Sequence, residues 1–194
     1  MCSEELFNEI LRKVSKWSSM GANSLSNGVR LICPTPALGP KAWLHVIFAP
    51  LAPETIMDVA RTLRVSLPND FAKFLRLANG LMLFNYRISV WGVRTSMVRL
   101  GGDESWQPQD LADQNFETMR PDGSPEDIVF FGGSDDGETW CFFESDGDGY
   151  RVGKTNRHRF DTIAYWPDFG SWLLSEIESL ETLFDADGVM RVKR

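Results

Sequence analysis

The hydrophobic period of this chain changes at Asn79-Gly80, and that change constrains the fold more than any other sequence feature. Before this point, Phe71, Phe74 and Leu75 follow the i, i+3, i+4 spacing of an amphipathic helix. After it, short apolar or alternating runs are separated by Gly and Asp, as in antiparallel strands joined by turns. The sequence therefore predicts an α+β fold, with helices packed on a mostly antiparallel sheet of about five or more strands.

The same patterns place the individual elements. Helices are expected over residues 4–17, 52–63, 68–78 and 168–184, with a short one over 108–118. Strands are expected over 29–33, 42–48, 81–84, 87–92, 127–133, 138–145 and 149–154. Ser66 suits the cap of the 68–78 helix, and Asn79-Gly80 suits its end. We expect one domain over residues 1–194, with a core at about 51–184 and an N-terminal helix and strand extension over 1–50.

Composition excludes several classes of protein. With 43% hydrophobic and 12% aromatic residues, the chain can bury a large core without disulfides or a structural metal. Cys2, Cys33 and Cys141 are too widely spaced for a disulfide framework or a CxxC metal pair, so reduced thiols are expected. The N-terminal residues show no signal-peptide pattern, and no run reaches the length of a membrane span. We expect a cytoplasmic protein without membrane contact.

Side chains that could carry chemistry are few. His45 lies in an apolar run and His158 in a basic one, and no spacing pairs either with Cys141 as a nucleophile and base. The acids in the glycine-containing stretch 132–140 oppose phosphate binding. The turns that begin at Asp146 and Asp185 lack the later ligands of a calcium loop. We expect no enzyme activity, no catalytic residue, no cofactor and no metal.

Charge is distributed unevenly along the chain. The net charge is −7, yet residues 103–148 contain 14 acidic residues and a single basic one, Arg120. One interpretation is a set of solvated loops. The other is an electrostatic field that attracts a basic protein and repels nucleic acid.

Trp106 is the tryptophan expected on the surface, because it lies among acids rather than in an apolar run. Aromatic side chains at interfaces often anchor a partner. We expect Trp106 and the acids to share one face and to contact a basic protein partner. The expected contact residues are Asp103, Glu104, Trp106, Asp135, Asp136, Glu138, Asp146 and Asp148.

A series of motifs resembles the SUKH superfamily, which includes the yeast cell-wall-synthesis regulator and many bacterial immunity proteins. The resemblance covers about residues 51 to 184, and the order of its motifs is more specific than any one of them. The matching residues are Leu67, Pro68, Asp70, Phe71, Phe74, Leu75, Asn79 and Gly80, followed by Trp91-Gly92, Phe131-Gly132, Phe169 and Trp172-Leu173.

This resemblance implies a non-enzymatic protein-binding domain. An immunity protein of this type blocks a cognate bacterial toxin by occluding its active face. An acidic surface suits a nuclease toxin, whose phosphate-binding cleft is basic. Two alternatives remain open: a regulatory adaptor resembling the cell-wall regulator, and an enzyme with a cryptic site. The segments 1–50 and 101–127 look expanded relative to the motif series, so partner choice is expected to reside there.

Overall fold

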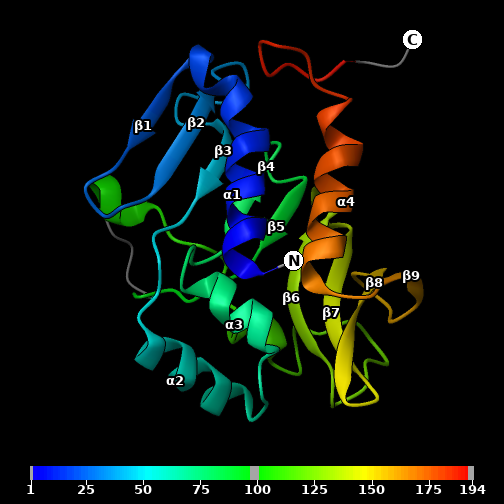
Figure 1. Ribbon diagram of the computed structural model, residues 1–194. Coiled ribbons are helices and arrows are strands. Elements are labelled where there is room, and N and C mark those ends of the chain that lie inside the picture. Colours follow the sequence, from blue (N-terminus) through cyan, green and yellow to red (C-terminus); the bar gives the residue numbers. More distant parts are fainter. Residues whose placement is uncertain (1, 97–100, 192–194) are drawn as a thin grey trace.

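The computed structural model describes residues 2–96 and 101–191, and the side chain of Asp136 also lies outside this description. Within these residues nine strands form one antiparallel sheet whose spatial order follows the chain (Figure 1). The strands are β1 (Ala22–Ser24), β2 (Arg30–Pro34), β3 (Trp43–Ile47), β4 (Leu81–Leu83), β5 (Ile88–Val90), β6 (Val129–Ser134), β7 (Thr139–Asp146), β8 (Gly149–Asn156) and β9 (Thr162–Trp166). The predicted α+β class is confirmed.

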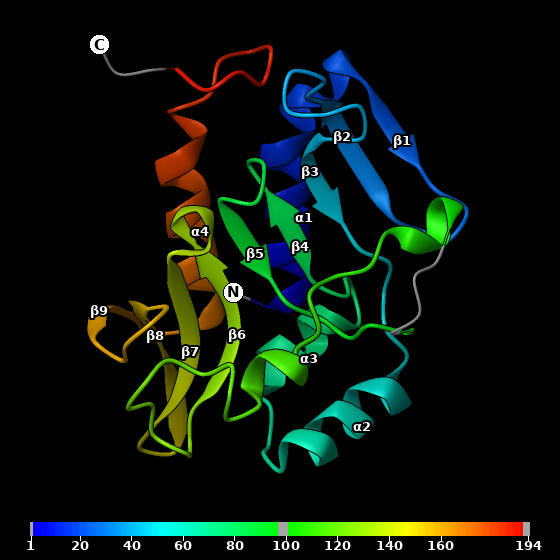
Figure 2. The ribbon, with the colours of Figure 1, turned by 180° about the vertical axis from the view of Figure 1, so that it is seen from behind.

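The helices lie mainly on one face of the sheet. In the described part of the chain they are α1 (Ser3–Val14), α2 (Pro53–Leu63), α3 (Asn69–Leu75) and α4 (Phe169–Glu181). Figures 1 and 2 show α1 and α4 side by side on the same face, with α3 near the start of α1. A capping box begins α1, because Cys2 Sγ accepts the Glu5 N–H and Glu5 Oε2 accepts the Cys2 N–H at 2.9 Å.

The apolar stripe of α3 joins the sheet to α4. The Phe71 ring lies 5.6 Å from Phe131 on β6, 5.0 Å from Phe143 on β7 and 5.2 Å from Phe169 on α4, measured between centroids. All of these rings are buried. The expectation that the stripes of both helices face one core is confirmed for Phe71, Phe74, Leu75, Trp172 and Leu173, whereas Leu67 is only half-buried.

The predicted bounds of the 68–78 helix are wrong at both ends. The helix begins after Pro68, without a side-chain cap, so Ser66 does not cap it. It ends at Leu75, before Asn79-Gly80. Asn79 instead joins two segments far apart in the chain: its Nδ2 donates to the Val93 carbonyl at 2.8 Å, and its Oδ1 accepts the Val93 N–H at 2.7 Å. Gly80, at φ 82°, then turns the chain into β4.

The helix expected over 108–118 is absent from the structure, which has only a 3₁₀ turn at Asp113–Asn115. The physical reason is local. Asp110 Oδ1 accepts the N–H groups of Ala112 and Asp113, both at 3.0 Å, as a helix N-cap does, but Phe116 is already extended, at φ −64° and ψ 144°, so the helix stops after one turn. The Asn115 side chain then donates to Phe130 O and accepts the Phe130 N–H, which ties the segment to β6.

The first fifty residues extend the same sheet. Strands β1 to β3 continue it beyond β4, to which β3 is joined through the pairs Val46–Met82 and Ile47–Leu81. Strands β1 and β9, which form the two edges, were not predicted. None of the described helices combines the length and apolar character that a membrane crossing needs.

Candidate interaction surface

The sheet face opposite α1, α3 and α4, here called the open face, carries a second apolar cluster. Val29, Leu31, Val46, Phe48 and Met82 form this cluster, and Leu25, Trp43 and Trp106 pack against it. Figure 2 shows the 101–115 segment crossing this side of the sheet. The expectation that Trp106 is a free surface anchor therefore needs correction, because the ring is half-buried and covers part of the cluster.

Asp103 holds the segment that carries Trp106. It lies in η2 (Gly102–Ser105), where its Oδ2 accepts hydrogen bonds from the Ser26 amide at 2.9 Å and the Ser26 hydroxyl at 2.8 Å. Asn27 Nδ2 donates to the Asp103 carbonyl at 2.8 Å. The backbone hydrogen bond from Ser26, followed by the hydroxyl, lowers the pKa of Asp103. Asp103 thus fixes the 101–106 segment to the β1–β2 turn, and the neighbouring Glu104 is exposed.

Asp135 and Glu138 lie in the β6–β7 hairpin turn. Asp135 forms an ion pair with Lys154 Nζ at 2.9 Å, and the same Nζ lies 3.2 Å from Glu176 Oε1 on α4. Burial lowers the pKa of Lys154, but the hydrogen bond to Asp135 and the charge of Glu176 outweigh it, so the pKa is raised. Asp135 is therefore already engaged, whereas Glu138 is exposed. The side chain of Asp136 lies outside the described part.

Asp146 and Asp148 lie at the opposite end of β7 from Glu138. Strand β7 spans Thr139–Asp146, so the β6–β7 and β7–β8 turns are at its two ends. Successive turns of an antiparallel meander alternate between the two ends of the sheet. The expectation that all the acids share one face around Trp106 is therefore wrong: they occupy three places. Whether any of them contacts a partner stays a prediction.

Two adjoining hollows form a groove on the open face. One, of about 230 Å³, is lined by Ser89, Gly133, Trp140 and Arg157 among others. The second, of about 480 Å³, lies among Lys41, Met82, Arg94 and Trp106. Tyr86 and Gln109 line both hollows and so join them. Pairing explains the position, because Met82–Ser89, Ser89–Gly133 and Gly133–Trp140 are directly opposite pairs on one face of the sheet.

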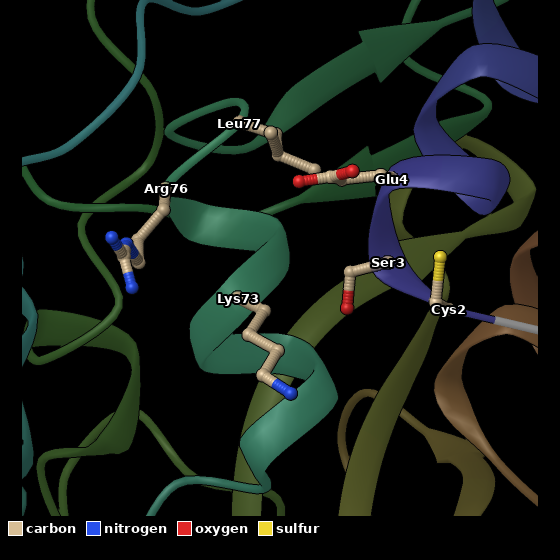
Figure 3. Close-up of a pocket in the computed structure, with 6 residues that line it drawn as sticks. All are labelled: Cys2, Ser3, Glu4, Lys73, Arg76 and Leu77. Carbon is tan, nitrogen blue, oxygen red and sulfur yellow. The ribbon is translucent and has the colours of Figure 1, made fainter.

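A further hollow of about 460 Å³ lies on the helical side, between α1 and α3. Figure 3 shows its lining, with Cys2, Ser3 and Glu4 from α1 and its cap, and Lys73, Arg76 and Leu77 from α3 and the residues after it. Lys73 and Arg76 are exposed there, and Glu4 supplies an opposite charge. This hollow is therefore mixed in charge.

The groups with catalytic potential do not form a constellation. Burial, followed by the charge of Lys16, lowers the pKa of His45 to about 3, and its Nδ1 accepts the Phe84 N–H at 3.4 Å. Burial raises the pKa of the Cys141 thiol well above its ordinary value. His158 is exposed, in the loop after β8. Across residues 2–96 and 101–191, no three His, Cys, Asp or Glu side chains are arranged to hold a metal ion.

Comparison with known proteins agrees with the order of motifs along the chain. Residues 50–175 match the sequence model of the SMI1 / KNR4 family (SUKH-1). The match confirms the SUKH resemblance and includes α3 and the strands β4 to β9. No curated protein matches the chain.

Proposed function

The chain belongs to the SMI1 / KNR4 family (SUKH-1), and from this premise we propose that it is an immunity protein that binds and neutralises a cognate bacterial toxin. The single observation that carries the proposal is the family match. The state of the reactive groups supports a non-enzymatic role: His45 is buried and neutral above about pH 3, and Cys141 is a buried thiol with a raised pKa.

The proposed mechanism is occlusion of the toxin's active face. Glu104, Glu138, Asp146 and Asp148 are exposed, and none of them has an ion-pair partner among the described residues. We propose that Asp146 and Asp148, which lie together in the β7–β8 turn, face a basic partner such as a nuclease domain, whereas Glu104 and Glu138 lie elsewhere. Exposed charges of this kind raise the association rate more than the final affinity. They also oppose direct nucleic-acid binding.

The neighbouring genes give the first test, since a toxin domain encoded there is expected for an immunity protein and not for a regulatory adaptor. Co-expression with such a toxin domain is the second test. We expect the chain to restore growth of a bacterial host that produces the toxin, and to elute with the toxin as a stoichiometric complex. A triple variant, His45→Gln with His158→Gln and Cys141→Ser, should bind equally well once its folding is verified. Growth arrest despite abundant folded chain would contradict the immunity role and favour the regulatory adaptor. Loss of protection in the folded triple variant would instead favour an enzyme.

A further inference from the structure

The groove on the open face has a charge opposite to that of the whole protein. Lys41 follows β2, Arg94 follows β5 and Arg157 follows β8, and all three are exposed. None has an ion-pair partner among the described residues, and the residues that line the two hollows include no carboxylate. The protein has a net charge of −7, yet three cationic side chains from three different loops line this one groove.

A strained turn places Tyr86 where the two hollows meet. Phe84, Asn85 and Tyr86 all have positive φ, at 53°, 55° and 71°, a region that costs energy for bulky side chains. Hydrogen bonds hold the turn: the Asn85 N–H donates to Leu44 O at 2.9 Å, and Thr35 Oγ1 donates to Asn85 Oδ1 at 3.1 Å. The Tyr86 side chain is nevertheless 53% exposed. The strain is therefore not offset by burial of this ring.

The floor of the groove is suited to an extended chain. Ser89 and Gly133 are small, so the floor is low between Met82 on one side and Trp140 on the other. Trp91 also lines this part and is 2% exposed, yet its indole N–H has no acceptor among the described residues. That nitrogen is itself buried, so the small residues Ser89 and Gly133, and not this donor, define the floor of the groove.

We propose that this groove binds an extended acidic segment of a protein partner, with carboxylates near Lys41, Arg94 and Arg157 and apolar side chains against Tyr86 and Trp106. Charge complementarity selects this occupant. A nucleic acid has one negative charge per nucleotide and needs a cation near each phosphate, whereas the two hollows supply three cations among apolar and neutral side chains. A peptide can alternate a few carboxylates with apolar side chains and satisfy both kinds of lining.

This binding goes beyond the proposed immunity function. The carboxylates of the β7–β8 turn, Asp146 and Asp148, are proposed to face a basic toxin, whereas the groove takes a segment of the opposite charge on the open face. The two proposals therefore fail separately. Charge reversal in the groove should abolish binding of an acidic peptide without slowing association with a basic toxin.

Fluorescence anisotropy with a labelled peptide of alternating Glu and Leu tests the groove directly. Wild-type protein should bind the peptide at low salt, and Lys41→Glu with Arg94→Glu should weaken the affinity roughly tenfold or more. The matched control is Lys73→Glu with Arg76→Glu, the same change of charge in the helical-side hollow of Figure 3, and it should bind like wild type. Tyr86→Gly separates binding from folding, because Asn-Gly is favoured where both central residues of a turn have positive φ. This variant should lose affinity while its melting temperature stays equal or rises.

Three results would overturn the proposal. The first is no binding of the Glu-Leu peptide by wild-type protein, or equally tight binding of a Lys-Leu peptide. The second is an equal loss of affinity in the groove variant and in its helical-side control, which would indicate a response to net charge alone. The third is competition by a short oligothymidine that depends on Lys41 and Arg94, which would indicate a nucleic-acid site.

Discussion

Asn79 and Val93 exchange two hydrogen bonds between a side chain and the backbone, with the Asn79 amide donating at 2.8 Å and accepting at 2.7 Å. Asn79 is 6% exposed, so water does not replace these bonds. Gly92 packs directly against Asn79, and a Cβ at Gly92 would clash with the Asn79 Oδ1 and its backbone. The Asn-Gly pair that resembles a helix stop in the sequence therefore connects the end of the α3 region to the residues after β5.

Replacing Asn79 by Ala should lower the free energy of unfolding by roughly 2–4 kcal/mol. The substitution leaves the Val93 N–H and C=O without their side-chain partner in a partly buried setting. Urea unfolding measures the change, with Asn69→Ala as the control because Asn69 is exposed at the start of α3. The control should change stability by less than about 0.5 kcal/mol. Equal effects of the two substitutions would contradict the structural role of Asn79.

Phe74→Ala should cost about 3–5 kcal/mol of stability, the usual cost for a fully buried Phe. The ring is 0% exposed and lies 5.0 Å from Phe169 on α4 and 6.4 Å from Phe7 on α1, so its loss opens a cavity between three helices. Met57→Ala on α2 is a suitable control, since Met57 is 56% exposed. A loss at Phe74 below about 1 kcal/mol would mean that the stripe of α3 does not pack as described.

His45 should make stability depend on pH in a predictable direction. The folded protein keeps this side chain neutral down to about pH 3, whereas an ordinary histidine takes up a proton near pH 6.5. Below pH 6.5 the unfolded chain therefore binds more protons. The stabilising contribution is complete above pH 6.5 and falls as the pH decreases toward 3, by at most about 1.4 kcal/mol per pH unit.

Urea unfolding of wild type and His45→Gln between pH 7 and pH 4.5 measures this contribution. Because the carboxylates titrate in both proteins, the difference between the two curves isolates His45. We expect the wild type to lose stability more steeply than the variant. His158→Gln, which alters an exposed histidine, should follow the wild type. Parallel curves for wild type and His45→Gln would contradict the buried neutral state.

Lys154 links the β6–β7 turn to α4 through Asp135 and Glu176. Its removal should leave the Glu176 carboxylate without a cation in a poorly solvated position. Its side chain is 12% exposed and that of Glu176 is 13% exposed. We expect Lys154→Met to lower stability by roughly 2–4 kcal/mol. Adding Glu176→Gln should restore part of the loss, because the remaining side chain is then neutral. Thermal unfolding of the four proteins of this double-mutant cycle tests the coupling, and strictly additive losses would argue against it.

Local patterns predicted most of the fold because they report which face of an element is apolar. The stripe of Phe71, Phe74 and Leu75 and the short apolar runs of β6 and β7 were sufficient for the core. The edge strands were missed for opposite reasons: β1 has three exposed residues, and Thr162–Trp166 exposes Ile163 and Tyr165 on an edge. β1 therefore shows no alternation, and β9 alternates with its apolar Ile163 and Tyr165 on the exposed side, which is the reverse of the usual strand pattern.

The candidate surfaces were harder to predict because they depend on how distant residues meet. Glu138 and Asp146 are close in sequence, yet they lie at opposite ends of β7. Lys41, Arg94 and Arg157 are far apart in sequence, yet the sheet brings them to one groove. The one local signal was Asn85-Tyr86 between two apolar runs. This pattern indicates a hairpin, but it does not tell which surface the Tyr86 side chain joins.

Stoichiometric titration is the most direct test of the central claim that this chain neutralises a toxin by occlusion. A toxin domain identified from a neighbouring gene is assayed for its own activity while the purified chain is added. We predict that activity falls in proportion to the chain added and reaches zero at one equivalent. Asp146→Lys with Asp148→Lys should slow this inhibition at low salt, since exposed carboxylates steer a basic partner. Full toxin activity in the presence of a large excess of folded wild-type chain would contradict the account.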